Sequence, residues 1–568
     1  MKNQQDGGEV LLDAFRDLAI EYVVCSAGSE WPPLWEALAR QRRDGLDGPK
    51  YLDCGHETLA VTIAAAYTQI TGKMQAVLLH AGAGLSQGSM AVGAARALET
   101  PMLVMSGETT AYGETEFDPG SQWYRNLSVV GGPQRLIEPV TKWAQQVPSF
   151  ETLYHSVLRA GELAQRAPKG PTYLCVSMET LLESRAEPST RRLVPPGPKL
   201  RPGADSLETV ANLIANAKRP VLSVLTVGPD REAFEALVEL AELAAMPVFE
   251  GAGAFFGNFP KTHDLYLGTD LKPHLQDCDL VLLVDNATPW YPPSRSPKDI
   301  PVVAIGESPL KSHLVYQNLG ATHYLEGDVA TTLRLLSDAV RRASRRERDV
   351  VERRAHWKKH HEAWRSKIAQ AEERAAAKET ITVPFLVNTL RRLLPAQTSY
   401  VDETIVHMKD LRDHLMWDDP HTFFRSPSGL GQGLGYALGV KLALPERLVV
   451  MTIGDGTFMY NPTIPALAFA DEHRLPLLIV ILNNLKYGVM EELHNRFYPE
   501  GTAQSRKDYY GVNLHDVAYE RVATMIDGYC RRVENKSELE EAIAEALKSV
   551  QAGKTAVLNV MMPETVAF

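Results

Sequence analysis

The stretch LVVMTIGDG, residues 448–456, joins an apolar strand to a carboxylate that stands between two glycines. A second apolar strand, LLIVIL at residues 477–482, ends at the pair Asn483-Asn484. Neighbouring parallel strands end at the same edge of a sheet, so Asp455 and the asparagines are expected to lie close together there. Carboxylate and amide oxygens suit Mg²⁺, and phosphate oxygens often complete its shell. Gly-Asp-Gly alone would be an ordinary turn, but the two strands and the Asn pair favour an α/β sheet with a magnesium and diphosphate site at its edge.

The composition limits the class of protein. At 568 residues the chain is too long for one core, and its length suggests three or four domains. A hydrophobic fraction of 45% is typical of a globular protein, and a diffuse net charge of −11 argues against a nucleic-acid surface. No apolar run is long enough to cross a membrane, and the polar start lacks the apolar core of a signal peptide. We therefore expect a cytoplasmic protein that has reduced cysteines and binds neither membrane nor nucleic acid.

Three blocks that alternate strands and helices follow one another along the chain, and this alternation predicts parallel sheets. The blocks cover residues 1–185, 204–340 and 380–568. A segment rich in proline and arginine, 184–203, joins the first two blocks. Residues 341–379 carry dense charge and are expected to form a solvated helical linker that exposes His360 and His361. The expected fold class is thus α/β, with three Rossmann-like domains.

A second motif lies in the first block, where Cys54-Gly55-His56-Glu57 precedes a helix of small residues that ends at Thr71-Gly72-Lys73. Together with the Gly-Asp-Gly and Asn-Asn motifs, it resembles the thiamine diphosphate (ThDP) enzymes related to pyruvate decarboxylase, acetolactate synthase and benzoylformate decarboxylase. The resemblance spans nearly the whole chain and is closest to benzoylformate decarboxylase in the active-site pattern. It implies a pyrimidine-binding, a central and a diphosphate-binding domain in that order. It also implies ThDP and Mg²⁺ as cofactors, and a homodimer or homotetramer with active sites at subunit interfaces.

Three residues of the first block are catalytic candidates. The resemblance implies that Glu57 activates the aminopyrimidine ring of ThDP, and the alternative is a carboxylate that only stabilises a helix dipole. His80 is expected to relay protons, because imidazole exchanges them near neutral pH, and the alternative is a structural histidine. Ser29, which follows Gly28, is expected to contact a substrate carboxylate unless it is a turn or N-cap serine.

In the third block, the resemblance implies a Mg²⁺ site made by the Asp455 carboxylate, the Asn484 side chain and the Lys486 backbone carbonyl. Leu430 is expected to wedge the two cofactor rings into a bent shape, although core packing would also explain an aliphatic residue there. The other residues expected to contact the cofactor lie at strand ends or in the metal motif: Glu403, Thr404, Gly454, Gly456, Thr457, Phe458 and Tyr487. Some carboligases hold FAD in the central domain, and nothing in this sequence argues for or against it.

The substrate pocket is less well defined by the sequence. The helix after the Asn pair lines this pocket in the resembling enzymes, so Val489 and Leu493 are expected to form an apolar wall. Plain amphipathic packing would also explain both residues. Phe424 and Gln122 are further pocket candidates. The chain departs from the family pattern in two ways. The loop after its metal motif is two residues longer than in benzoylformate decarboxylase. The second active-site histidine of that enzyme has no counterpart here.

The favoured function is the ThDP- and Mg²⁺-dependent, nonoxidative decarboxylation of a small 2-oxo acid through ylid and enamine intermediates, with carboligation as a side or main outcome. An acetolactate synthase-like carboligase is one alternative, and it would need an Arg or Lys that holds a second carboxylate. A lyase for 2-hydroxyacyl-CoA or 1,2-diketones is another, and it would need a nucleotide-sized groove in the central block. A catalytically silent ThDP-binding scaffold is the third, and the intact Glu57, Asp455 and Asn484 argue against it.

Overall fold

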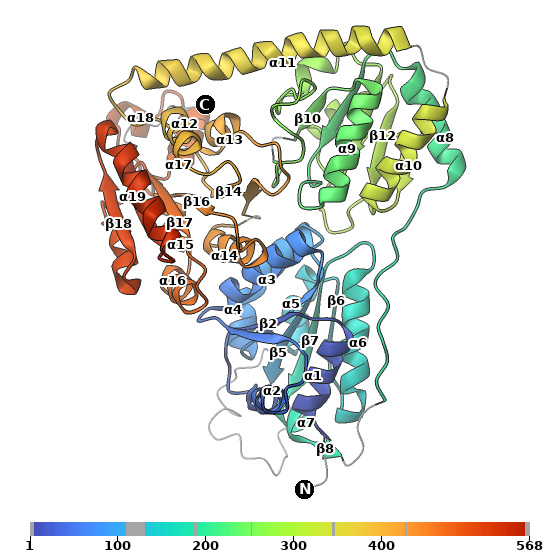
Figure 1. Ribbon diagram of the computed structural model, residues 1–568, viewed down its shortest axis with the longest axis vertical. Helices are drawn as coiled ribbons and strands as arrows, with labels where there is room; N and C mark the ends of the chain where they lie inside the picture. The colour runs from blue at the N-terminus through green and yellow to red at the C-terminus, as the bar shows by residue number, and fades with distance from the viewer. Residues whose placement is uncertain are drawn as a thin grey trace. The chain divides into compact units, whose positions relative to one another are not determined.

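The computed structural model describes residues 5–108, 131–185, 190–251, 253–343, 347–426 and 429–562 (Figure 1). The chain divides into two compact units. The first unit comprises Met1–Pro198, Pro427–Pro445 and Tyr460–Leu475, and the second comprises Lys199–Ser426, Glu446–Met459 and Pro476–Phe568. Three sheets of parallel strands that alternate with helices confirm the α/β fold class. None of the helices in the described ranges is long and apolar enough to span a membrane.

The first unit is built on a six-stranded parallel sheet with the order β3-β2-β4-β5-β7-β6. Strands β4, β5 and β7 are buried along their whole length, as in parallel sheets that helices cover on both faces. The strands are β2 (Tyr22–Cys25), β3 (Lys50–Asp53), β4 (Gln75–Leu79), β5 (Met102–Glu108), β6 (Trp143–Gln146) and β7 (Pro171–Ser177). The helices are α1 (Gly7–Asp17), α2 (Pro32–Asp44), α3 (Glu57–Thr71), α4 (Gly82–Ala97), α5 (Pro133–Ile137), η2 (Glu138–Val140), α6 (Phe150–Gln165), α7 (Met178–Leu182), α14 (Gly433–Ala443) and α16 (Thr463–Glu472).

A short antiparallel pair was not predicted from the sequence. Strand β1 (Gln5–Asp6) pairs with β8 (Ser184–Arg185), which brings the two ends of the first block together. Two-residue strands are too short to show an alternating pattern in the sequence.

Helix α3 positions the first predicted motif. It begins at Glu57, where the Nδ1 atom of the N-cap residue His56 accepts a hydrogen bond from Thr58 N at 3.2 Å. Residues 58–68 are all buried, because α3 packs against α4 and α14. A helix that is buried on all sides shows small apolar residues in its sequence instead of an amphipathic stripe. The predicted end of this helix at Thr71 is confirmed.

The second unit contains two parallel sheets, of which the central one has the order β10-β9-β11-β12-β13. Its strands are β9 (Pro220–Val224), β10 (Val248–Glu250), β11 (Leu280–Val284), β12 (Val302–Gly306) and β13 (His323–Glu326). Its helices are α8 (Ala204–Asn216), α9 (Arg231–Ala244), η3 (Lys272–His274), η4 (Pro293–Arg295) and α10 (Val329–Arg342).

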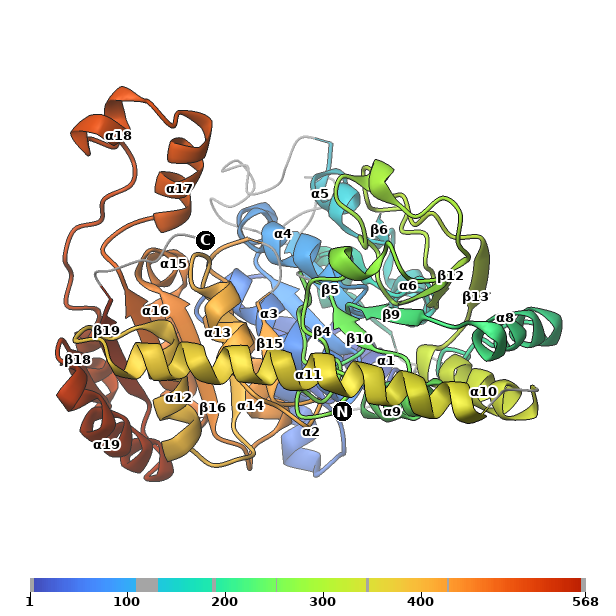
Figure 2. The ribbon, with the colours of Figure 1, turned by 90° about the horizontal axis from the view of Figure 1, so that it is seen from above.

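The charged linker is helical, as predicted, but it is not solvated along its whole length. Helix α11 (Glu347–Ala376) runs from the central sheet towards α12 (Val383–Leu393) (Figures 1 and 2). His360 is exposed, whereas His361 is buried, with its Nδ1 atom 2.9 Å from the carbonyl oxygen of Tyr266. The expectation that His361 is exposed was therefore wrong. Trp357, His361 and Trp364 are spaced four and three residues apart, which places them on the face that packs against the central sheet.

The third sheet has the order β15-β14-β16-β17-β19-β18 and is parallel throughout. Residue pairing places Glu403 beside Ile453 and Gly454 beside Leu482, so the carboxyl ends of β14, β16 and β17 lie together. The strands are β14 (Ser399–Glu403), β15 (Phe423–Arg425), β16 (Val449–Gly454), β17 (Leu478–Asn483), β18 (Tyr529–Val533) and β19 (Ala556–Met561). The remaining helices are α13 (Met408–His414), α15 (Asp455–Tyr460), α17 (Gly488–Phe497), α18 (Thr502–Arg506), η5 (Tyr519–Ile526), η6 (Lys536–Glu538) and α19 (Leu539–Gln551).

Candidate active site

In the first unit, Glu57 lies at the carboxyl edge of the sheet, where α3 begins. Its half-buried side chain reaches the first turn of α4 and lies close to Gly84. A methyl group placed on Gly84 would be 2.7 Å from Glu57 Oε1. A larger residue at position 84 would push the Glu57 carboxylate away. The carboxylate thus lies near the amino ends of two helices, whose dipoles stabilise a negative charge. Both the pyrimidine-activating role and the helix-dipole alternative are compatible with this placement.

His80 follows β4 at the same edge and is paired with a carboxylate that the sequence analysis missed. Its Nδ1 atom lies 2.8 Å from Oε2 of Glu30, a residue with no exposed surface. This hydrogen bond raises the pKa of His80, and the charges of Glu30 and Glu57 act in the same direction against partial burial. About a quarter of the His80 side chain stays exposed, at 24%. His80 is therefore a histidine whose charged form is favoured at a partly open position.

Ser29 occupies the exposed turn between β2 and α2, directly before Glu30. The N-cap residue of α2 is Trp31, so the N-cap alternative for Ser29 was wrong. The Nε1 atom of Trp31 donates a hydrogen bond to the carbonyl oxygen of Leu79 at 3.1 Å. Because Leu79 precedes His80, this bond holds the Ser29-Glu30 turn beside the predicted proton relay. Glu30 is adjacent to the predicted Ser29 in sequence, and that adjacency was the signal that could have identified it.

A second carboxylate that the sequence analysis missed is Glu108, the last residue of β5. It is 5% exposed, and burial raises its pKa to about 7, with a further contribution from the negative charge of Glu30. A hydrogen bond from the Cys175 thiol, 3.9 Å from Glu108 Oε2, acts in the opposite direction. Glu108 is thus a second group at this edge that exchanges a proton near neutral pH. No motif identified it in advance.

Leu430, the predicted ring wedge, also belongs to the first unit. It is half-buried and lies between Gly429 and Gly431, whose φ angles are 98° and 92°. Its proposed contact with a cofactor stays a prediction.

The predicted metal motif lies in the second unit at the carboxyl edge of the third sheet. Asp455 is the first residue of α15, directly after β16, and Asn484 directly follows β17. Both side chains are buried, with exposures of 3% and 6%. Oδ1 of Asp455 accepts a hydrogen bond from Gly456 N at 2.9 Å, whereas Oδ2 has no hydrogen-bond partner among the described residues. Burial raises the pKa of Asp455 to about 6, against the effect of the backbone amides of Gly456, Leu485 and Lys486.

A buried carboxylate oxygen without a donor is the feature expected where a cation belongs. The described residues contain no cluster of three or more His, Cys, Asp or Glu that could hold a metal. A site for Mg²⁺ here would therefore rely on one carboxylate with amide and carbonyl oxygens, which this hard cation accepts. The donor set of Asp455, Asn484 and the Lys486 carbonyl fits such an ion.

The turn after β17 is held in an unusual backbone conformation. Leu485 has a φ of 57°, in the left-handed region that costs a non-glycine residue about 1–2 kcal/mol. Leu514 N donates to the Leu485 carbonyl and Tyr487 N to the Val512 carbonyl, each at 2.8 Å, and these bonds stabilise the turn. Asn484 Oδ1 accepts a hydrogen bond from Lys486 N at 3.3 Å. Backbone strain of this kind concentrates at functional sites. Here these hydrogen bonds hold the strained backbone that carries the predicted metal ligands.

The end of β14 is fixed by a network around the buried Asp402. Thr404 donates to Asp402 Oδ1 through its N and Oγ1 atoms, at 3.0 and 2.7 Å, and Arg425 Nη1 lies 2.6 Å from Oδ2. Glu403 is 3% exposed and accepts a hydrogen bond from Ser426 Oγ at 3.2 Å. The structure thus brings Glu403 and Thr404 to the same sheet edge as Asp455, and their contact with a cofactor stays a prediction.

The remaining cofactor candidates and the pocket candidates differ in their surroundings. Gly456, Thr457 and Phe458 lie in the first turn of α15 and are buried, and Tyr487 is the N-cap residue of α17. Val489 and Leu493 are half-buried on α17, which has no fully buried residue and projects from the third sheet (Figure 2). Phe424 is fully buried against Phe256, with ring centroids 6.3 Å apart. Gln122 lies outside the described residues.

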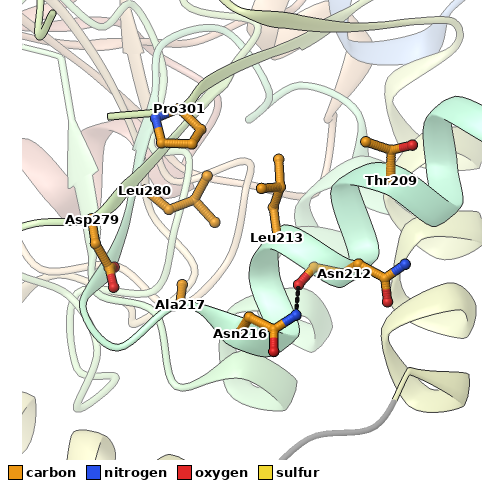
Figure 3. A pocket seen from close by; sticks show the side chains of 8 residues that line it. All are labelled: Thr209, Asn212, Leu213, Asn216, Ala217, Asp279, Leu280 and Pro301. Atoms are coloured by element: carbon orange, nitrogen blue, oxygen red, sulfur yellow. Dashed lines mark hydrogen bonds between the residues drawn. The ribbon is translucent and has the colours of Figure 1, made fainter. Parts of the chain in front are cut away.

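A cavity of about 480 Å³ lies in the central domain of the second unit, and none of the candidate site residues lines it (Figure 3). It is found between α8 and the amino ends of β11 and β12, and Asn212, Asn216, Asp279 and Pro301 are among the residues that line it. Ligands of open α/β sheets bind outside the carboxyl ends of the strands. This cavity is therefore at the edge of the central sheet opposite to the one where a ligand is expected.

Both groups of candidate residues lie at the carboxyl ends of parallel strands, which is where α/β proteins of this class bind their ligands. Models of the domains of thiamine pyrophosphate enzymes, thiamine pyrophosphate being another name for ThDP, match the chain in the expected order. The N-terminal TPP binding domain matches residues 5–127, the central domain 207–336 and the C-terminal TPP binding domain 407–560. The chain belongs to the superfamily of ThDP-dependent enzymes.

Similar proteins include both synthases and lyases. The chain is 24% identical to the catalytic subunit of acetolactate synthase from Aspergillus candidus over 537 residues, which cover 88% of this chain and 74% of that protein. It is 23% identical to 2-hydroxyacyl-CoA lyase 2 of Danio rerio, over 99% of this chain and 93% of that protein. Among solved structures, benzoylformate decarboxylase from Polynucleobacter necessarius is similar with a TM-score of 0.78, 20% identity, and coverage of 99% and 100% of the two chains. This last similarity shows the fold alone.

Proposed function

We propose that this protein decarboxylates a 2-oxo acid without an oxidant, using ThDP and Mg²⁺. The observation that carries the proposal is the pairing of a partly exposed His80 with the buried Glu30 at the sheet edge that also holds Glu57. Conversion of a 2-oxo acid to an aldehyde requires a proton on the carbon that loses CO₂. A histidine whose charged form is favoured can supply that proton. Capture of the same carbon by a second 2-oxo acid has no such requirement.

The residues present fit the proposed cofactors. Asp455, Asn484 and the Lys486 carbonyl would hold Mg²⁺, and the Oδ2 atom of Asp455, which has no hydrogen-bond partner among the described residues, supports this assignment. The amides and hydroxyl in the first turn of α15 would bind the diphosphate, because the amino end of a helix favours anions and this one adjoins the metal ligands. When bound, ThDP supplies a nucleophilic carbon and an electron sink.

The chain's own residues would bind the substrate and move protons. Glu57 would exchange a proton with the pyrimidine ring, and His80 would deliver a proton from Nε2. Ser29 would bind the carboxylate of the substrate from its exposed turn, while Val489 and Leu493 would provide an apolar wall. In the resembling enzymes, the two groups of residues meet across a subunit interface, so a homodimer or homotetramer is proposed as the active form.

A carboligase of the acetolactate synthase kind is the second candidate, favoured by the sequence similarity to that enzyme. It would need a cation for the carboxylate of the second acid. Lys486 is one candidate cation near the site, but its Nζ atom is already 2.6 Å from Oε2 of Glu491. This pairing argues against Lys486 as a free carboxylate-binding group.

A lyase for CoA thioesters has less support from the central sheet. Its strand order places the ligand-binding crevice between the carboxyl ends of β9 and β11. There, the amides of Val227 and Gly228 both donate to Asn258 Oδ1 at 2.8 Å, and Asp230 caps α9. These amides are the groups that would otherwise bind a phosphate, and the protein uses them itself.

The test is an assay for CO₂ release and product identity with pyruvate, benzoylformate, phenylpyruvate and branched 2-oxo acids, in the presence of ThDP and Mg²⁺. An aldehyde from one of these acids establishes the decarboxylase and identifies its side-chain preference. An acyloin or acetohydroxy acid as the main product assigns the carboligase instead. Absence of reaction across the panel, with ThDP shown to be bound, refutes the decarboxylase proposal.

A further inference from the structure

Glu30 stands out among the acidic residues at the edge of the first sheet. It has no exposed surface, and its Oε1 atom has no hydrogen-bond partner among the described residues. Within those residues, the contact of Oε2 with His80 is the one polar interaction of its side chain. A buried carboxylate is usually compensated by several donors or by an arginine or lysine. In the described part of the chain, His80 alone provides this compensation.

The pair is held together from both backbone segments. A methyl group at Gly28 would lie 2.4 Å from Glu30 Oε2 and 2.5 Å from His80 Nδ1, so a side chain there would separate the two groups. On the other side of Glu30, the indole of Trp31 is hydrogen-bonded to Leu79, the residue before His80. The carboxylate and the imidazole are therefore positioned by residues adjacent to each of them, and neither depends on a flexible surface contact.

The surrounding charges favour a positive imidazole. Glu57 faces His80 from α3, and Glu108 faces Glu30 from β5. Cys25 of β2 also senses the charge of Glu30, and burial raises its pKa to about 12, so it stays neutral. Glu179 and Cys175, which face Glu108, add no positive charge. Among the described residues, the titratable groups that face this pair are thus acidic or neutral, and a protonated His80 is the one positive group.

We infer that Glu30 is a positioning residue, which holds the Nδ1–H of His80 and thereby makes Nε2 the atom that delivers protons to the substrate. This inference rests on the proposed function of His80. In one turnover, the Nε2–H bond would break as the proton moves to the carbon that has lost CO₂. The neutral imidazole would keep its Nδ1–H on the Glu30 side chain, as the histidine of a Ser-His-Asp triad keeps its Nδ1–H on the aspartate. Nε2 would then regain a proton from solvent, which reaches the exposed part of the ring.

The test compares the wild-type protein with Glu30→Gln by NMR titration of ¹⁵N-labelled histidines, and the His80→Gln variant assigns the His80 signals. Glu30→Gln preserves the shape of the side chain and removes its charge. We expect the His80 titration to move to lower pH in this variant. In wild type, neutral His80 is expected to carry its proton on Nδ1. Glu36→Gln is the matched control, because the Glu36 side chain lies on α2 and is 68% exposed.

The pH profile of kcat provides the second readout. In Glu30→Gln, the alkaline limb of the kcat profile should move to lower pH. At pH values above the new limb, kcat of the variant should fall about tenfold per pH unit relative to wild type, until His80 of the wild type also loses its proton. Glu30→Asp retains the charge, so its kcat profile should lie between that of the wild type and that of Glu30→Gln. It also serves as the variant if Glu30→Gln does not fold.

Two results would overturn the inference: an unchanged His80 titration in a folded Glu30→Gln protein, or an Nε2-protonated neutral form in the wild type. The NMR arm needs no substrate, so it separates this inference from the proposed function. A shifted titration together with no turnover of any 2-oxo acid would support the positioning of His80 and reject the decarboxylase. Turnover of a 2-oxo acid that depends on His80 but not on Glu30 would support the decarboxylase and reject the positioning role of Glu30.

Discussion

Asp455→Asn is the variant for which the structure makes the sharpest prediction, because two measurements should change in opposite directions. The Asp455 carboxylate is buried, and one of its oxygens has no hydrogen-bond partner in the described part of the chain. Burial raises its pKa from 3.8 to about 6, so without a cation the charged form destabilises the fold. That shift corresponds to about 3 kcal/mol at pH 7. Asparagine removes the charge and keeps the shape.

The sign follows from proton linkage. A carboxyl group whose pKa is higher in the folded state binds its proton more tightly there, so stability falls as the pH rises from about 4 to about 6. Without Mg²⁺ and ThDP, Asp455→Asn should therefore be more stable than wild type at pH 7 by up to about 3 kcal/mol. The difference should shrink as the pH falls towards 4. Thermal unfolding between pH 4 and pH 8 measures it.

Addition of Mg²⁺ and ThDP should reverse the order. A ligand at one hundred times its Kd stabilises a protein by about 2.7 kcal/mol. Binding of Mg²⁺ and ThDP should therefore raise the melting temperature of the wild type. The variant should lose most of this increase, because it lacks the carboxylate ligand. Asp277→Asn, at a side chain that is 77% exposed, is the control and should change neither measurement. A variant that is less stable than wild type without Mg²⁺, or that keeps the full response to Mg²⁺ and ThDP, would refute this reasoning.

Three further variants test other parts of the structure. Glu57→Gln should retain ThDP, measured by calorimetry, and lower kcat by about 10²- to 10⁴-fold, since it loses the proton-exchanging group; undiminished turnover would contradict its role. His80→Ala should lower kcat by a similar factor of about 10²- to 10⁴-fold with little change in ThDP affinity, and the opposite pattern would make His80 structural. Lys261→Met should lower the free energy of unfolding by about 3–5 kcal/mol, because the fully buried Nζ of Lys261 donates to three carbonyl groups at the end of α13 and its loss would leave them without that donor. Denaturation in urea measures this, the exposed Lys298→Met is its control, and equal losses in both variants would count against the explanation.

The strands and buried helices of this protein were predictable because their signals are local. An apolar run such as Leu280–Val284 marks a buried parallel strand by itself, and the structure places β11 over that span. Residues at the ends of such strands were predictable for the same reason, since parallel strands end at one edge of a sheet. Asp455, Asn484 and Glu403 are found there as expected.

The charged linker shows where local signals were insufficient. Its dense charges predicted a solvated helix, but a stripe that includes Trp357 and His361 packs against the central sheet. Long charged side chains on the other faces concealed that stripe, because a helix that is polar over most of its surface gives a weak periodic signal.

The sequence by itself determined the fold class, the order of the three domain matches and the residue types available for chemistry at the strand ends. Only the tertiary structure decided which of these residues have partners. Glu30 and His80 are fifty residues apart, and no period or spacing in the chain relates them. That Asp455 Oδ2 has no hydrogen-bond partner within the described ranges is likewise a property of packing. Burial and hydrogen-bond partners depend on segments that meet only after folding, and a linear pattern cannot record such contacts.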